Sequence, residues 1–328
     1  PCPTACACAS TWATPPFPIS IDPLLDSPSW TATGAAMSRF GAAMTSGDWN
    51  GDGLVDVAIG APRSSQSRWR EGAVHVFYGT GAGLPAVADV VLYGGAANAR
   101  FGAALASGDV DGDGLEDLWV GAPGWSNGHR EEGAVFGFGG GTLAPIFSWE
   151  PDQAFAQAGE AVAAGAGALV EGAPGWTGSQ WLEGAVFAWQ GLLGAPGFSW
   201  NGGSALRLLG RSVALGDLDG DGFDDVLMGA PGWRHTRRGE GAVRVATGSA
   251  SGWGAVSWSG FGGQRGAMLG RSVAVLEGWA MAGAPGWNGT AVDEGAAFGW
   301  QGLGSTPGWS LRSGQRGARL GEAVGAAG

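Results

Sequence analysis

The chain has 328 residues, of which 66 are glycine, and 29 acidic residues against 17 basic ones give it a formal charge of −12. Glycine costs about 1 kcal/mol relative to alanine inside a helix, so this content disfavours long helices, and the acidic balance excludes a protein built to bind a phosphate backbone. No apolar run reaches the roughly 18–20 residues of a membrane span, and a hydrophobic share of 45% excludes a disordered linker. The composition therefore predicts a globular, all-β protein with many turns.

The first 27 residues form a segment rich in cysteine and proline, which we expect to be a tail or a donor strand outside the main domain. The segment begins at Pro1 without an initiator methionine, which indicates a processed or trimmed product. Its cysteines allow one local disulfide and one thiol free for cross-linking, or a tail with incidental thiols: Cys2, Cys6 and Cys8. A zinc site is not expected there, because a fourth ligand and a nearby histidine are missing.

From residue 28 onwards the sequence is an internal repeat. Gly-Ala-Pro recurs five times, and Glu-Gly-Ala follows nine residues after each of its prolines. The repeated glutamates are Glu71, Glu132, Glu183, Glu240 and Glu294. An apolar residue followed by glycine stands 20 residues before Gly-Ala-Pro in repeats one, two and four, and 14 residues before it in repeats three and five. This constant frame, with a six-residue insertion in three copies, defines one domain over residues 28–328.

Each repeat divides into four short strands separated by turns of Gly, Asn, Asp and Ser. In repeat two the expected strands are FGAALASGD, EDLWVGAP, GAVFGFG and IFSWE. Four strands in each unit, repeated radially, predict a β-propeller built of four-stranded blades. A β-solenoid is the main alternative, but its coils are shorter, at about 20–30 residues. Tight turns and close contacts between blades then explain the high glycine content.

Phe-Gly followed by Gly-Ala-Pro, with an acidic loop between them, resembles the FG-GAP repeat of integrin α-subunit propellers and their bacterial relatives. The resemblance covers about residues 28–328 and five full repeats. Repeats three to five depart from it with Ala or Leu in place of Phe, and repeats three and five lack the acidic loop. The closed form of the family has seven blades, which implies that this chain holds five full blades and pieces of others.

Partial blades are expected at both ends of the repeats. Ser29-Trp30 matches the fourth strand of later repeats, and Arg319–Val324 matches a first strand. A closing blade would take its outer strand from the start of the chain and its inner strand from the end, without its middle strands. Three explanations stay open: a truncated sequence, a strand supplied by residues 11–25, or a strand from a neighbouring molecule.

The six-residue insertions form acidic loops between the first and second strands. Oxygen side chains at positions 1, 3, 5 and 9 and a main-chain carbonyl at position 7 can surround a hard cation, and glycine at positions 4 and 6 permits sharp turns. We predict three Ca²⁺ sites, formed by Asp48, Asn50, Asp52, Leu54 and Asp56; by Asp109, Asp111, Asp113, Leu115 and Asp117; and by Asp217, Asp219, Asp221, Phe223 and Asp225. The ion would stiffen each hairpin, since clustered carboxylates repel one another without a cation.

Tryptophan follows Gly-Ala-Pro-Gly in four repeats: Trp125, Trp176, Trp233 and Trp287. In the family this loop lies on the face opposite the Ca²⁺ loops, so these side chains could stack on sugar rings or anchor a protein partner. The alternative interpretation, which we favour, is that they fill the gaps between blades.

We expect no enzymatic activity, because the three histidines (His75, His129 and His235) fall at unrelated repeat positions and no nucleophilic triad can be assigned. The favoured hypothesis is an extracellular or cell-surface propeller for adhesion or structural assembly, with a protein partner or another copy of itself and without nucleic acid. A carbohydrate-binding propeller and the propeller part of a larger secreted enzyme are the alternatives. Arginine without lysine, with frequent alanine and glycine, indicates a GC-rich bacterial source.

Overall fold

The computed structural model describes residues 30–192 and 194–325, and over these ranges it contains twenty β-strands. The chain divides into two units, Pro1–Thr31 and Ala32–Gly328, and all of these strands lie in the second. None of the residues in the described ranges forms a helix long and apolar enough to cross a membrane. The expectations for residues 1–27, which include the pairing of the three cysteines and a donor strand, concern residues outside these ranges.

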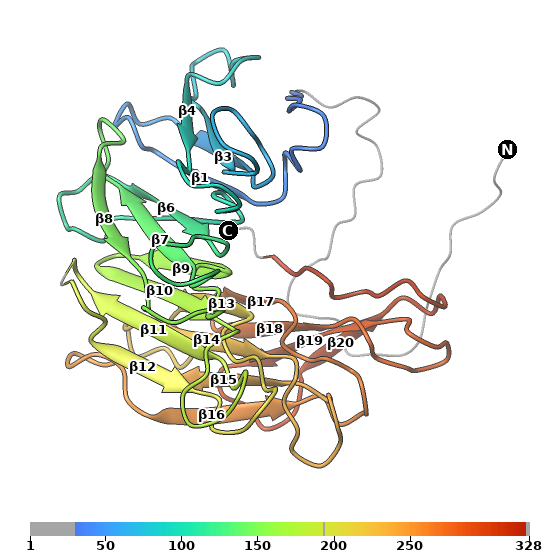
Figure 1. The fold of residues 1–328 in the computed structure, drawn as a ribbon. Coiled ribbons are helices and arrows are strands. Elements are labelled where there is room, and N and C mark those ends of the chain that lie inside the picture. Colours follow the sequence, from blue (N-terminus) through green and yellow to red (C-terminus); the bar gives the residue numbers. More distant parts are fainter. Residues whose placement is uncertain (1–29, 193, 326–328) are drawn as a thin grey trace, which may run out of the picture. The chain divides into compact units, whose positions relative to one another are not determined.

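Within the described ranges the strands form five four-stranded antiparallel sheets, each built from consecutive strands, and we call them blades 1 to 5 (Figure 1). Blade 1 holds β1 (Met44–Gly47), β2 (Asp56–Ala61), β3 (Ala73–Phe77) and β4 (Val90–Tyr93). Blade 2 holds β5 (Ala104–Gly108), β6 (Asp117–Ala122), β7 (Ala134–Phe138) and β8 (Pro145–Trp149). Blade 3 holds β9 (Ala161–Gly165), β10 (Ala168–Ala173), β11 (Ala185–Gln190) and β12 (Phe198–Asn201). Blade 4 holds β13 (Ser212–Gly216), β14 (Asp225–Ala230), β15 (Ala242–Ala246) and β16 (Val256–Phe261), and blade 5 holds β17 (Val273–Leu276), β18 (Trp279–Ala284), β19 (Ala296–Gln301) and β20 (Trp309–Arg312).

The second strand of a blade is covered on both faces, whereas the fourth strand forms an exposed edge. In blade 2 every residue of β6 is buried, but β8 leaves Pro145, Ile146 and Ser148 exposed. A strand that is covered on both faces has a continuous apolar run instead of an alternating pattern. This explains the apolar sequence DLWVGA of β6. The five four-stranded sheets confirm the four strands expected in each repeat.

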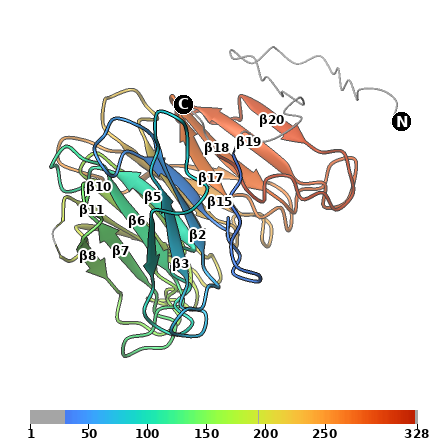
Figure 2. The same ribbon diagram turned by 90° about the horizontal axis from the view of Figure 1, so that it is seen from above.

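The blades follow one another through their first strands. β1 contacts β5, β5 contacts β9, β9 contacts β13, and β13 contacts β17. A parallel bridge marks each junction and joins the glycine after the repeated glutamate to the apolar residue that opens the next repeat: Gly72 to Phe101, Gly133 to Ala158, Gly184 to Leu209 and Gly241 to Leu269. The result is the radial arrangement of a β-propeller, and Figure 2 shows the blades from above, with β5 and β17 labelled. Among the described residues no contact of comparable extent joins β1 to β17, so this row of blades is open.

The hydrophobic cores lie between the blades. At the first junction Val74 and Val76 of blade 1 pack with Leu118 and Val120 of blade 2, and equivalent clusters fill the junctions that follow. The glycine of each Gly-Ala-Pro makes this packing possible, because it has no side chain. A methyl group on Gly121 of β6 would collide with the main-chain carbonyl of Gly159, which opens the next repeat.

Two local features differ from the expected strands. In blade 2 the first strand begins at Ala104 and not at Phe101, because Gly102 has a φ of +84° and turns the chain before the strand starts. Near the other end, Leu320 forms the same parallel bridge, here to Gly295. The expected strand over Arg319–Val324 does not form, since no second strand pairs with it in the described part of the chain. Trp30 also lies outside any strand, and Ser29 falls outside the described ranges.

Candidate functional site

The acidic loops connect the first and second strands of blades 1, 2 and 4, and they therefore lie at equivalent places in the fold. In blades 3 and 5 a two-residue turn takes their place: Gly165 pairs with Ala168, and Leu276 pairs with Trp279. A tight hairpin turn of this length is a complete connection by itself. The six additional residues of the acidic loops are thus not needed to join the strands, which indicates that they have another role.

In each acidic loop the main chain turns around the carboxylate at position 1. In blade 2 the Asp109 carboxylate accepts hydrogen bonds from the N–H groups of Gly112 (2.7 Å) and Gly114 (3.1 Å). Both glycines have positive φ values, of 80° and 92°, which side chains with a Cβ rarely adopt. Asp48 and Asp217 accept the equivalent bonds in blades 1 and 4. The glycines at positions 4 and 6 are therefore required by the backbone of the loop.

The aspartate at position 9 is buried at the base of each loop. Asp117 is fully buried and accepts hydrogen bonds from the N–H groups of Val110 (3.0 Å) and Gly140 (3.3 Å). Burial raises its pKa, the N–H of Val110 lowers it, and the nearby Asp111 carboxylate raises it further, so the pKa lies above the ordinary value. Asp56 and Asp225 are buried in the same way and have raised pKa values for the same reasons. A cation placed among these groups would favour their charged forms.

The carboxylates of the loops converge in blades 2 and 4. Oxygen atoms of Asp109, Asp111 and Asp117 lie within 4.8 Å of one another, and the corresponding oxygens of Asp217, Asp219 and Asp225 do the same. The loop of blade 1 has Asn50 at the position of Asp111 and so has one carboxylate fewer. Asp113 and Asp221 at position 5 are not members of these two clusters, and they accept hydrogen bonds from the N–H groups of Leu115 and Phe223. Converging carboxylate and amide oxygens with no nitrogen or sulfur donor fit Ca²⁺.

Each acidic loop also contacts the next blade. The residue at position 2 is apolar and buried: Trp49, Val110 and Leu218. Trp49 packs among Leu118, Val120 and Leu143 of blade 2, and its indole N–H donates to the Ser107 hydroxyl at 3.0 Å. The loops therefore link the conformation of one hairpin to the packing of the following blade, a connection that the spacing of the acidic residues does not reveal.

The tryptophans after Gly-Ala-Pro-Gly pack against the third strands. Trp125, Trp176 and Trp287 are half-buried and make edge-to-face contacts with Phe136, Phe187 and Phe298, with ring centroids 5.0, 5.3 and 4.8 Å apart. Trp233 is buried, and the guanidinium groups of Arg207 and Arg244 lie over its ring at 3.5 and 4.7 Å. These contacts support a packing role, and ligand binding by the exposed ring edges stays a prediction.

The repeated glutamate of Glu-Gly-Ala organises the loop between the second and third strands. Glu71 is fully buried and accepts hydrogen bonds from the N–H groups of Gln66 (2.9 Å), Ser67 (2.8 Å) and Arg68 (3.1 Å). Burial raises the pKa of Glu71, but these donors outweigh burial and the pKa ends below its ordinary value. Glu240 shows the same balance with His235, Thr236 and Arg237. The repeated glutamate thus has a structural role in this loop.

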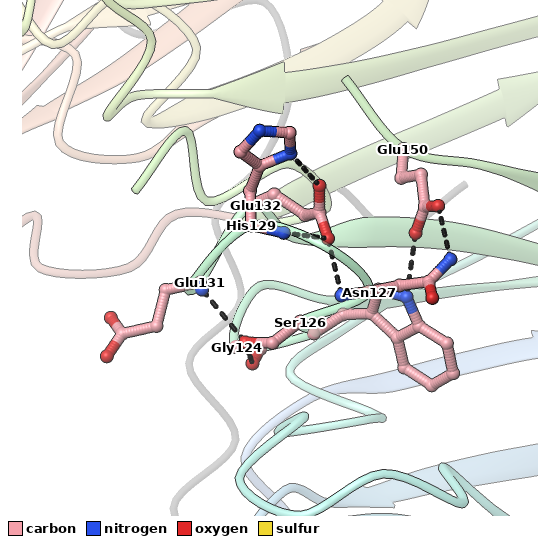
Figure 3. A network of polar contacts seen from close by, with 8 residues as sticks. Gly124, Ser126, Asn127, His129, Glu131, Glu132 and Glu150 are labelled. Carbon is pink, nitrogen blue, oxygen red and sulfur yellow. Dashed lines mark hydrogen bonds and ion pairs between the residues drawn. The ribbon is translucent and has the colours of Figure 1, made fainter. Parts of the chain in front are cut away.

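One cluster was not found from the sequence. His129 and Glu132 of the loop between β6 and β7 lie with Asp152 of the connection between β8 and β9, and their potential ligand atoms are within 4.8 Å of one another. Figure 3 shows His129 and Glu132 in the hydrogen-bond network of this loop. A signal was present in the repeat alignment, because Asp152 stands where other repeats have Gly95, Gly203, Gly263 and Gly314.

Comparison with known proteins gives matches in the same segments. Residues 40–77, 101–138 and 209–245, which include the three acidic loops, match the FG-GAP repeat. The chain is 33% identical to integrin alpha-4 of Xenopus laevis over 198 residues, which cover 59% of this chain and 14% of that protein. It is 44% identical to phosphatidylinositol-glycan-specific phospholipase D of Mus musculus over 92 residues, which cover 26% of this chain and 11% of that protein. Among solved structures, the Dos1 propeller aligns with 73% of this chain and 50% of its own, with 9% identity and a TM-score of 0.41.

Proposed function

We propose that this chain, which carries FG-GAP repeats and is distantly similar to integrin α-subunits, is a calcium-stabilised propeller that serves adhesion or structural assembly outside the cell without enzymatic activity. The convergence of oxygen donors at equivalent places in the acidic loops supports this role most directly. Asp109, Asp111 and Asp117 would hold one Ca²⁺ ion, and the corresponding residues of blades 1 and 4 would hold two more. The ion supplies positive charge that offsets the repulsion between the carboxylates.

The concentration of free calcium outside the cell is high enough to fill sites of this kind. Extracellular modules bind Ca²⁺ with dissociation constants of about 10⁻⁴–10⁻³ M, which match free calcium outside the cell. The similarity to an integrin α-subunit supports the same location. The propeller would then present its loops and edges to a partner on a rigid frame.

Calcium removal tests the proposal. We expect the melting temperature of the full chain to fall in excess chelator and to recover when Ca²⁺, but not Na⁺, is added back, because binding to the folded state alone stabilises it. D109N and D217N each remove one position-1 carboxylate, and they should each reduce the number of Ca²⁺ ions bound in a calorimetric titration. D89N, outside the loops, is the matched control. An identical melt with and without chelator would refute calcium stabilisation.

We infer that the open row of blades associates with a protein partner, and a further copy of this chain is the first partner to test. Leu105 of blade 2 packs into the core at the first junction. Its counterpart in blade 1 is Met44, which is 65% exposed and lies at the side where the described residues form no preceding blade. Light scattering across a range of protein concentrations should show association that M44E weakens. A concentration-independent monomer mass would exclude self-association and leave another protein as the partner.

Carbohydrate binding is a second candidate, supported by a groove of about 740 Å³ at the outer strands of blades 3 and 4. Trp200, Trp253 and Arg244 are among its lining residues, and the Nε atom of Arg244 is buried without a hydrogen-bond partner in the described structure. Aromatic rings and a few polar groups are the usual means of holding a sugar. A glycan array with the parent chain and R244A tests this candidate, and binding that is absent from both would exclude it.

A third candidate function is that this chain is the propeller part of a larger secreted enzyme. The similarity to phosphatidylinositol-glycan-specific phospholipase D supports this candidate. The reading frame on either side of this sequence in its gene distinguishes this candidate from the first two. A catalytic domain encoded in the same frame would support it.

A further inference from the structure

A histidine and two carboxylates meet on blade 2 outside the acidic loops. His129 and Glu132 belong to the loop between β6 and β7, and Asp152 belongs to the connection between β8 and β9. One potential ligand atom from each lies within 4.8 Å of the other two. The connection that carries Asp152 is held in place by Gln153, whose side-chain amide exchanges two hydrogen bonds of 2.7 Å with the main chain of Thr177 in blade 3.

The Glu132 carboxylate directs a buried, unpartnered oxygen into this cluster. Glu132 is fully buried, and its Oε1 atom accepts hydrogen bonds from the N–H groups of Asn127 and His129. Its Oε2 atom is buried and has no hydrogen-bond partner. The His129 Nδ1 atom lies 3.4 Å from Oε2. Figure 3 shows the His129 ring facing the Glu132 carboxylate. A buried carboxylate oxygen that accepts no hydrogen bond costs free energy, and a cation held between it and the His129 imidazole would offset that cost.

Three of the other repeats supply a donor to the second oxygen of the glutamate. In blades 1 and 4 this donor is a hydroxyl four residues before the glutamate, from Ser67 and Thr236. In blade 5 the Thr290 hydroxyl shares Oε2 of Glu294 with the Ala291 N–H, and Oε1 has no hydrogen-bond partner. In blade 3 the N–H of Gly203 donates to Glu183. Blade 2 has Gly128 in place of the hydroxyl residue, and it has Asp152 in place of the glycine. It therefore lacks the donor and adds a carboxylate and a histidine.

The nearby acid Glu150 is already engaged elsewhere. Its carboxylate accepts hydrogen bonds from the Trp125 indole N–H at 2.8 Å and from the Asn127 side-chain amide at 2.7 Å. These bonds hold the loop in place beside the cluster (Figure 3). The ligand set is therefore one imidazole nitrogen and two carboxylates.

We propose that His129, Glu132 and Asp152 bind a transition-metal ion of the Zn²⁺ class. Bonds of 2.0–2.1 Å in a tetrahedral site place neighbouring ligand atoms about 3.4 Å apart, which matches the distance between His129 Nδ1 and Glu132 Oε2. Imidazole nitrogen suits Zn²⁺ and its neighbours in the first transition row, whereas Ca²⁺ and Mg²⁺ take oxygen ligands. Three protein ligands leave the fourth position open to water or to a group from a partner.

Zinc titration of the full chain tests this proposal. The background variant C2S/C6S/C8S removes the thiols, which also bind zinc, and saturating Ca²⁺ occupies the acidic loops. We expect one Zn²⁺ ion per chain by calorimetry, and Co²⁺ should give the visible absorption of a tetrahedral site. H129A and D152G should each weaken binding by about tenfold or more. D152G restores the glycine of the other repeats at a position where φ is +51°, so it should not strain the fold.

H235A is the matched control, because His235 lies in the equivalent loop of blade 4 and stacks on Phe261 at a ring-centroid distance of 4.3 Å. It should leave Zn²⁺ binding unchanged. Absence of stoichiometric Zn²⁺ binding in the thiol-free chain would overturn the proposal and reduce the cluster to a histidine–glutamate pair. Equal affinities for the parent, H129A and D152G would overturn it as well. H129A and D152G leave the acidic loops unchanged, so their effect on Zn²⁺ affinity is distinct from failure of the proposed calcium-dependent function.

Discussion

At the scale of single residues, Glu171 is the clearest departure from the repeat. It lies on β10, where Ile59, Val120 and Met228 occupy the same position in blades 1, 2 and 4. Glu171 is fully buried, its Oε2 atom accepts a hydrogen bond from the Gly159 N–H at 2.6 Å, and its Oε1 atom has no partner. Burial raises its pKa from 4.5 to about 8, although the Gly159 N–H opposes the shift. The side chain is therefore protonated in the folded protein at neutral pH.

We expect Glu171 to make the fold less stable as pH rises. Between about pH 4.5 and pH 8 the folded state retains a proton that the unfolded state has released. The free energy of unfolding therefore falls with pH over this window, by up to ~1.4 kcal/mol per pH unit from this group. E171Q should remove this slope, and E277Q in an exposed turn should not. Urea unfolding at pH 5 and pH 8 measures the difference, and equal slopes for the parent and E171Q would contradict the assignment.

At the scale of elements, the acidic loop connects a hairpin to the next blade. Trp49 is fully buried at the first junction, although it belongs to a loop in which the Asp52 side chain is exposed. A calcium ion that fixes this loop would also hold the tryptophan in place. Calcium removal should therefore weaken contacts between blades in addition to the turn itself.

W49A should lower the free energy of unfolding by about 3–5 kcal/mol, as is usual when a large buried aromatic side chain is removed. V55A, in the same loop but 66% exposed, should change it by less than about 0.5 kcal/mol. Chemical denaturation at saturating Ca²⁺ provides the comparison. A loss below 1 kcal/mol for W49A would show that the loop does not anchor the junction.

The repeat spacing predicted the blades and the acidic loops because both depend on local sequence. Strand length, turn glycines and the position of each aspartate in the loop are all fixed within one unit. The cluster of His129, Glu132 and Asp152 depends on two connections that meet only in the folded blade, so its members are not adjacent in the motif. The buried position of Glu171 likewise appears only in the fold, where Gly159 at the start of the same repeat donates to its carboxyl group. These features needed the structure.

At the scale of the whole row, and within the described residues, blades 2 to 4 contact a neighbouring blade on two sides and blades 1 and 5 on one. Ion pairs reinforce the later junctions: Glu160 pairs with Arg211, and Arg271 pairs with Glu322 at 2.9 Å. Blades 1 and 2 have Ala42 and Ala103 at the equivalent positions and make no such pair. Stability should therefore vary along the row.

Hydrogen exchange of the calcium-loaded chain should show this gradient. We expect amides of β10 in blade 3 to exchange most slowly and those of β2 in blade 1 to exchange faster, because local opening requires less free energy where fewer contacts are broken. Mass spectrometry of peptides from each second strand gives the order. Uniform protection across the blades would contradict it and show that the row unfolds as a single unit.

The contact between the glycine of Gly-Ala-Pro and the glycine that opens the next repeat recurs at every described junction, from Gly60 with Gly102 to Gly283 with Gly321. Each blade thus presents the same glycine contact surface to the blade that follows it, and any blade of this repeat can pack there. A gene with this property can duplicate or delete one unit and still encode blades that dock. The number of blades can then change over generations, whereas the paired glycines must stay. Loops such as the one carrying His129 can diverge in one blade without disturbing the others.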